Sequence, residues 1–184
     1  MKGVVFTEFL EMVEDRFSPE MADRIVERAG LPSGGVYTTV GTYDHGEMIQ
    51  LVSCLSEATG IPSTELVRSF GMHLFGRFHT MFPKYFEDIT SSFEFLQRVD
   101  HYIHVEVQKL YPDAELPSFD CDTSRPGCLR LTYRSSRPFA ALAEGLIRGC
   151  VAHYGEAIDV AMEDLSDGTG TAARFVLTKR GAAP

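Results

Sequence analysis

The sequence is short of basic residues and has no long apolar run. Its 184 residues include 17 Lys and Arg against 26 Asp and Glu, a formal net charge of −9, and no Lys/Arg cluster is present. Because nucleic-acid phosphates require a basic surface, this balance excludes a nucleic-acid partner. The apolar runs are too short to span a bilayer, and the opening MKGVVFTEFLEM carries acidic residues inside its apolar pattern, unlike a signal peptide. We expect a cytoplasmic protein without a membrane partner.

Cysteine is also scarce and carries no recognisable motif. The four cysteines, Cys54, Cys121, Cys128 and Cys150, form no CxxC pair and no CxxCH sequence for covalent cofactor attachment. A zinc site needs four convergent ligands, and the short spacings that supply them are missing. We expect free thiols, although Cys121 and Cys128 bracket a Pro/Gly loop and could pair under oxidation.

The first two-thirds of the chain follow a helical period. Apolar stripes predict helices over residues 4–17, 19–29, 44–60, 63–82 and 91–110, with Gly- and Tyr-rich residues 33–43 as a loop or short strand. Ser18-Pro19 is typical of a helix start and Gly30 of a helix end. Asp44 with Glu47, and Ser91 with Glu94, have the spacing of capping boxes.

The period changes to that of a strand after a predicted linker over residues 112–128. CLRLTYRS alternates as a strand, Pro138 opens a helix, and AIDVAMEDL and ARFVLTK form two further strands joined through SDGTG. Helices followed by strands predict an α+β fold in a single domain over residues 1–184.

One strand continues from apolar into polar side chains on the same face. Leu129 and Leu131 begin that face, and Tyr133, Ser135 and Arg137 follow at every second position. A guanidinium and two hydroxyls form a row of donors suited to a carboxylate or phosphate. The alternative is a strand end that simply becomes solvated.

His104 lies on the helix predicted over residues 91–110, beside its apolar stripe of Leu96, Val99, Ile103, Val107 and Leu110. It could be a core histidine, a surface residue or a ligand at a cavity wall. A histidine ligand together with a row of anion-binding donors suits a cofactor that has a metal centre and carboxylate arms. Haem has this shape, and the apolar helical section would supply its cavity.

At this point the sequence resembles the H-NOX (haem-nitric oxide/oxygen binding) family, which includes stand-alone bacterial sensors and the haem domain of soluble guanylate cyclase. The resemblance covers nearly the whole chain. It rests on the opening MKG, FPKYF at 82–86, the D-x-x-x-H helix with Asp100 and His104, Leu116-Pro117, and Y-x-S-x-R at 133–137.

The resemblance implies a haem pocket between a helical distal subdomain, residues 1–65, and a proximal subdomain, residues 66–184, with an antiparallel sheet. Non-covalent haem b would take His104 as its proximal iron ligand. Tyr133, Ser135 and Arg137 would hold the propionates, and Pro117 would press on the porphyrin. The implied pocket lining is apolar and consists of Val5, Phe9, Leu74, Phe78, Leu142 and Leu146.

The apolar residues Leu142 and Leu74 stand where family members that bind dioxygen stably carry a tyrosine and a polar partner. Because bound dioxygen gains much from a hydrogen-bond donor and nitric oxide gains little, the resemblance implies a nitric oxide sensor. It further implies no enzymatic activity, no zinc site, and signalling to a separate effector, a histidine kinase or a diguanylate cyclase, when His104 is released.

Three other functions remain open from the residues alone. A dioxygen or carbon monoxide sensor would use the same haem. A haem enzyme such as a peroxidase would need polar acid/base groups on the distal side, and none is placed there. A haem-free module could bind carboxylates through the Tyr133, Ser135 and Arg137 row.

Overall fold

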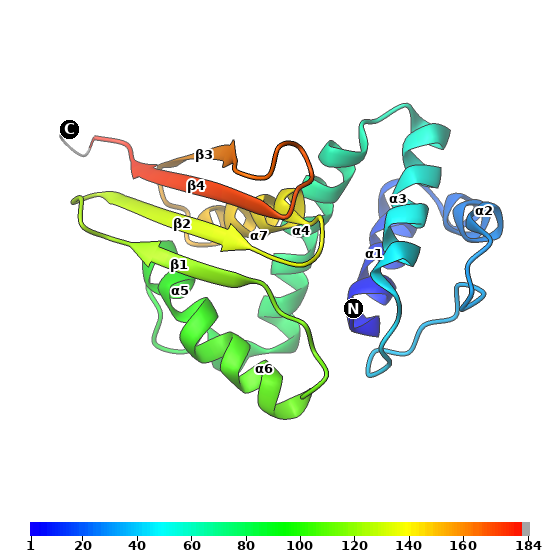
Figure 1. The fold of residues 1–184 in the computed structure, drawn as a ribbon, viewed down its shortest axis with the longest axis horizontal. Coiled ribbons are helices and arrows are strands. Elements are labelled where there is room, and N and C mark those ends of the chain that lie inside the picture. The colour runs from blue at the N-terminus through cyan, green and yellow to red at the C-terminus, as the bar shows by residue number, and fades with distance from the viewer. Residues whose placement is uncertain (182–184) are drawn as a thin grey trace.

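A computed structural model describes residues 1–181, in which a four-stranded sheet packs on helices and a further group of helices lies beyond one end of the strands (Figure 1). The α-helices are α1 (Gly3–Arg16), α2 (Pro19–Ala29), α3 (His45–Thr59), α4 (Ser63–Met81), α5 (Ser92–Arg98), α6 (His104–Leu110) and α7 (Ala140–His153). A 3-10 turn (Pro83–Tyr85) follows α4, and a π-helical turn (Val99–Ile103) joins α5 to α6. The strands are β1 (Ser118–Asp122), β2 (Cys128–Arg134), β3 (Ile158–Asp164) and β4 (Ala172–Lys179). The predicted α+β fold is confirmed.

The ends of the early helices follow their capping residues. The Ser18 hydroxyl accepts a hydrogen bond from the Met21 amide at 3.2 Å, and Gly30 ends α2 in the left-handed region at φ 57°. Asp44 caps α3 through the Gly46 amide at 2.6 Å. The capping box predicted for Asp44 and Glu47 is wrong, because the Glu47 carboxylate turns inward and accepts hydrogen bonds from the hydroxyls of Ser33 and Tyr37.

The sheet is antiparallel throughout, in the order β1-β2-β4-β3. Residues 158–164 and 172–179 pair as the predicted hairpin. The linker predicted over residues 112–128 is wrong in its middle, where β1 forms the sheet edge beside β2. Its sequence SFDCD is acidic, and its side chains alternate between exposed and half-buried. An edge strand of this kind gains its stability from the ladder to β2 rather than from an apolar face of its own.

The strand register also removes the disulfide considered from the sequence. Cys121 lies across from Leu131, and Cys128 lies across from Thr178 on the other neighbouring strand. Cys121 is therefore three positions along the ladder from Cys128, about 10 Å at the rise of a strand. This separation exceeds the reach of a disulfide, and all four cysteines are free thiols.

Residues 92–110 follow one continuous helical path with a change of period in its middle. Ser91 caps its start by accepting from the Glu94 amide at 3.3 Å, and the π-helical turn interrupts the α-helix directly before His104. The first part of this path, α5, is anchored, because the fully buried Ser92 donates from both its amide and its hydroxyl to the Glu156 carboxylate. No residue of α6 is buried, so its outer end is held much more loosely.

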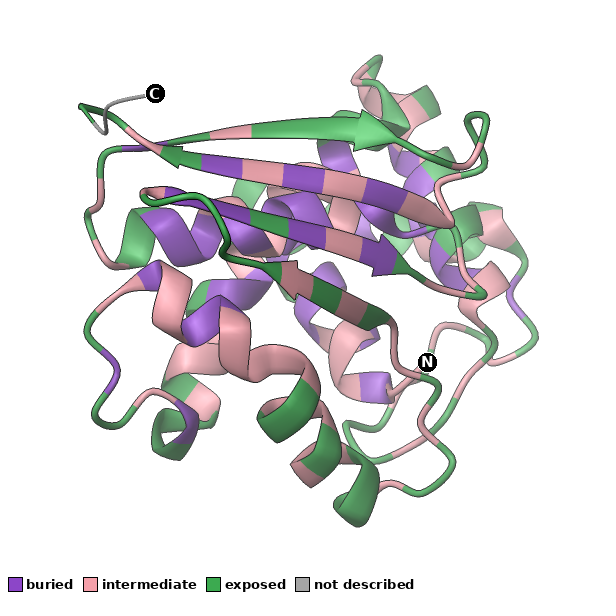
Figure 2. Cartoon of the chain, turned by 60° about the vertical axis from the view of Figure 1, so that its left-hand side comes forward, coloured by how far each residue is buried: buried purple, intermediate pink, exposed green. Residues whose placement is uncertain are grey.

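Two apolar clusters fill the molecule, and α4 contributes to both. One cluster joins α1, α2, α3 and the first half of α4, and the other joins the sheet to α5 and α7 (Figures 1 and 2). Along β2 and β4, buried residues alternate with less buried ones, so that one face of the sheet lies on the core (Figure 2). Phe70 and Leu74 of α4 belong to the first cluster and Phe75 to the second.

The two clusters are joined where α4 and α7 touch at backbone distance. Gly145 of α7 lies against the backbone of α4, and a Cβ atom there would stand 2.1 Å from the Arg68 carbonyl oxygen. Only glycine allows the two helices to approach this closely. The Arg68 guanidinium also donates to the buried carboxylate of Glu144, the residue before Gly145, at 2.7 Å. This hydrogen bond holds α4 and α7 together next to the close backbone contact.

Gly145→Ala should therefore force α4 and α7 apart and lower the free energy of unfolding by about 1–3 kcal/mol. Gly76→Ala is the matched control, because a Cβ atom at Gly76 of α4 meets nothing within 4 Å. That substitution should leave stability unchanged or raise it by up to about 1 kcal/mol, since alanine favours the helix. Urea denaturation followed by circular dichroism measures both, and equal effects would contradict the close-contact argument.

Candidate functional site

The polar row at the end of β2 continues the burial pattern of the strand. Leu129, Leu131 and Tyr133 are buried, Ser135 and Arg137 are half-buried, and the residues between them are mostly exposed. The turn is held by the β3–β4 loop, because the Ser135 amide donates to the Thr171 carbonyl at 2.9 Å. The predicted alternation of burial thus continues to Arg137, but the strand ends at Arg134, so Ser135 and Arg137 lie in the turn that follows it and not on the strand face.

The hydrogen-bond donors of Tyr133, Ser135 and Arg137 lie close together, and one of them has no partner in residues 1–181. Burial raises the pKa of Tyr133, and the Ser135 hydroxyl and the Phe139 backbone oppose that rise. The Ser135 hydroxyl also accepts from the Arg137 amide at 3.0 Å. Arg137 donates through Nη2 to Glu115 at 3.0 Å, whereas its buried Nε has no hydrogen-bond partner in residues 1–181. A buried guanidinium donor without a partner suits an anionic ligand.

His104 begins α6 directly after the π-helical turn, with 18% of its side chain exposed. Its Nδ1 atom is buried and lies 3.7 Å from Asp100 Oδ1, too far for a hydrogen bond, and it has no other partner among the described residues. Burial lowers the pKa of His104, while Asp100 and the Pro117 carbonyl oppose that shift. The imidazole is therefore neutral at pH 7, which is the form that ligates a metal.

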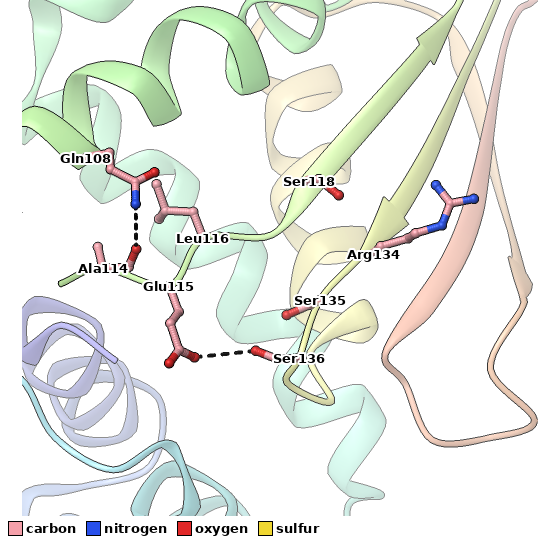
Figure 3. A pocket seen from close by; sticks show the side chains of 8 residues that line it. All are labelled: Gln108, Ala114, Glu115, Leu116, Ser118, Arg134, Ser135 and Ser136. Carbon is pink, nitrogen blue, oxygen red and sulfur yellow. Dashed lines mark hydrogen bonds between the residues drawn. The ribbon is translucent and has the colours of Figure 1, made fainter. Parts of the chain in front are cut away.

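Phe119 of β1 connects the histidine to the polar row. Its ring centroid is 6.0 Å from that of His104 and 5.5 Å from that of Tyr133, its partner across the ladder. Beside them lies an open pocket of about 550 Å³. Figure 3 shows this pocket between α6, the segment before β1 and the turn after β2, with the lining residues Gln108, Ala114, Glu115, Leu116, Ser118, Arg134, Ser135 and Ser136.

The six apolar residues proposed from the sequence to line a pocket share one cluster. Phe9 and Leu74 are almost fully buried within it, and the half-buried side chains packed against it include Val5, Phe78, Leu142 and Leu146. Leu146 also packs against the cluster under the sheet. These side chains come from α1, α4 and α7.

Comparison with known proteins identifies the family. The sequence model described as Haem-NO-binding matches residues 2–162. The chain belongs to the H-NOX family. An H-NOX protein from Shewanella woodyi, described as IWP-051-bound in the Fe(II)CO ligation state, is 44% identical with a TM-score of 0.83, over 100% of this chain and 97% of that chain. The Fe(II) unliganded H-NOX protein from K. algicida is 35% identical with a TM-score of 0.92, over 100% and 99%. No curated protein matches.

H-NOX domains are haem-based gas sensors, so the family binds haem and a gas ligand. The residues of this chain fit such a cofactor. A neutral, half-buried imidazole whose buried Nδ1 has no hydrogen-bond partner in residues 1–181 suits an iron ligand, and the buried Nε of Arg137 suits a carboxylate. In residues 1–181 no helix is long and apolar enough to cross a membrane.

Sequence reasoning missed contacts made by residues beside those it singled out. Asp100 belongs to the D-x-x-x-H motif, and its Oδ1 also accepts a hydrogen bond from the Phe119 amide of β1 at 2.9 Å. Glu115 lies in the predicted linker and accepts from Arg137. Neither contact has a local sequence signal, because the partners are 19 and 22 residues apart. Only the path of β1 brings them together.

Asp100→Ala should release β1 from the helix that carries His104. We expect a loss of roughly 0.5–1.5 kcal/mol of unfolding free energy and about tenfold faster hydrogen exchange at the Phe119 amide, because that amide loses its acceptor. Asp120→Ala, at an exposed position of the same strand, is the control and should change neither. Unchanged protection of the Phe119 amide in Asp100→Ala would contradict the contact.

Proposed function

We propose that this protein is a nitric oxide sensor that holds non-covalent haem b, with His104 as the proximal ligand of the iron. The observation that supports nitric oxide as the gas is the apolar character of Leu74 and Leu142. Leu74 is 2% exposed and Leu142 is half-buried against the same cluster, so neither offers a donor to a bound gas. Dioxygen depends on such a donor, whereas nitric oxide does not.

The remaining site residues have separate roles in this proposal. Tyr133, Ser135 and Arg137 bind the propionates, and Pro117, which precedes β1, presses on the porphyrin. Val5, Phe9, Leu74, Phe78, Leu142 and Leu146 exclude water from the distal side. When bound, haem supplies the ferrous iron to which a diatomic gas binds. The protein supplies a neutral imidazole, anion donors and an apolar wall, and it has no catalytic role.

Release of His104 from the iron is the proposed signal. The helix that carries it is anchored at Ser92 by Glu156, yet α6 has no buried residue and ends at Leu110, which is 64% exposed. The π-helical turn separates these two parts, and such turns often mark functional positions. If the iron no longer held His104, this residue and α6 could shift while α5 stayed in place, which would bias a two-state element.

The signal would pass to a separate effector in the cytoplasm, for which we propose a histidine kinase or a diguanylate cyclase. Carbon monoxide is a second candidate ligand, because the Shewanella woodyi relative is described in the Fe(II)CO ligation state. That protein is also described as bound to IWP-051. We propose that this chain can bind the same small molecule.

The absorption spectrum of the reduced protein tests the gas assignment. We expect a ferrous haem band that shifts to the position of five-coordinate haem when nitric oxide is added, and no oxygenated spectrum after exposure to air. A stable oxygenated spectrum would move the function to dioxygen sensing, and absence of a haem band would remove the sensor. His104→Gly is the control for ligation. Without His104 the ferrous haem should lack its protein ligand, so the spectrum of the unliganded wild type should appear only when imidazole is added.

Arg137→Ala should weaken haem retention, because a buried charge-assisted donor is lost. We expect about 10- to 100-fold faster transfer of haem to apomyoglobin, the range that corresponds to one charged hydrogen bond. Arg130→Ala is the matched control on β2, the strand before the turn that carries Arg137, because Arg130 is exposed and pairs with Asp122. Equal transfer rates in the two variants would contradict propionate binding by Arg137.

A further inference from the structure

An ion pair between a buried glutamate and a partly exposed arginine joins α1 to α4 beside the apolar cluster. Glu8 of α1 is 4% exposed and accepts hydrogen bonds from Arg77 Nε at 2.5 Å and from Arg77 Nη2 at 3.3 Å. Arg77 Nη2 also donates to the exposed Glu11 at 3.2 Å. A buried carboxylate is tolerated only when it is paired, so Glu8 holds Arg77, and with it α4, in a fixed position.

The pair lies at the edge of both helical walls of the proposed gas pocket. On α1, Glu8 is three residues after Val5 and adjacent to Phe9. On α4, Arg77 is three residues after Leu74 and adjacent to Phe78. Residues three and four apart share a helix face, so the same spacing on both helices places the charges beside the apolar walls. The Phe9 ring also packs against Phe70 of α4 at 5.2 Å between centroids.

We propose that Glu8 and Arg77 are positioning residues that set the separation of α1 and α4 and thereby control how readily a diatomic gas reaches the iron. This inference rests on the proposed haem site. Neither residue touches the gas, and both act through Val5, Phe9, Leu74 and Phe78. Without the pair, the apolar packing between the helices would remain, but the edge of the wall would open.

His73 adds a proton-dependent component to the same contact. Its buried Nε2 has no hydrogen-bond partner in the described residues and lies 3.8 Å from Glu8 Oε2. The charged groups that face it are Glu8, Asp15 and Arg16 on α1 and Arg77 on its own helix. Burial lowers the pKa of His73, and Glu8 opposes that shift. Protonation of His73 therefore requires a pH below the ordinary range of histidine, and it would give α4 a second cation against Glu8, which would tighten the contact.

Flash photolysis of the ferrous carbon monoxide complex measures gas access directly. Glu8→Gln should raise the bimolecular association rate of carbon monoxide at least fivefold, because the charge that holds Arg77 is gone. Glu11→Gln is the matched control and should stay within twofold of the wild type, because Glu11 contacts the same guanidinium from an exposed position. Arg77→Lys keeps the charge but loses the two-point contact and should also accelerate association.

A pH series separates this role from a general loss of stability. In the wild type, association should slow as the pH falls from 7.5 to 5.5, and His73→Gln should remove that dependence. Wild-type association that is independent of pH would overturn the role of His73. If Glu8→Gln does not fold, Arg77→Lys decides the result. Association rates of the variant within twofold of the wild type would overturn the inference, and normal carbon monoxide binding by the wild type would still support the haem site. A colourless wild-type protein would instead contradict the proposed function itself.

Discussion

The backbone contact between α4 and α7 is the constraint on which the rest of the structure depends. Gly145 brings the two helices so close that a single methyl group would collide with the Arg68 carbonyl. On one side of this contact, α4 carries Phe70 and Leu74 into the helical cluster, and on the other, α7 carries Ile147 and Cys150 under the sheet. The crossing of α4 and α7 therefore fixes the position of the helical section relative to the sheet. It also sets the distance between the walls of the proposed pocket that α4 and α7 contribute.

Buried carboxylates reinforce this arrangement at three places. Glu144 is 3% exposed and accepts from Arg68 at 2.7 Å and from Arg148 at 2.9 Å. Glu8 pairs with Arg77 between α1 and α4, and Glu47 accepts hydroxyl hydrogen bonds from the loop before α3. Each buried carboxylate takes at least one partner from another element. Removal of a partner would leave a charge in an apolar place, so these contacts specify position more than they add stability.

The sequence was most informative where local chemistry decides structure. Ser18, Gly30 and Ser91 mark helix ends because caps act within three residues, and the alternation through Tyr133 holds because a buried strand face repeats every second residue. Local patterns failed where a distant partner decides. Glu47 has capping-box spacing but bonds to Tyr37, and the acidic edge strand β1 has the composition of a linker. The grouping of His104, Phe119 and Tyr133 follows from that strand and has no local signal.

The helix that carries His104 unites these features. Its first part is fixed by the Ser92–Glu156 contact, its middle is a π-helical turn, and its last part has no buried residue. Asp100, in that turn, accepts from the Phe119 amide, and Phe119 pairs with Tyr133. A displacement of His104 would therefore be resisted at α5 and transmitted along β1 toward the turn that bears Ser135 and Arg137. In the proposed haem site, the gas and the propionates would thus act on opposite ends of one connected set of contacts, so that the strength of the proposed propionate binding and the ease of the proposed His104 release would depend on each other.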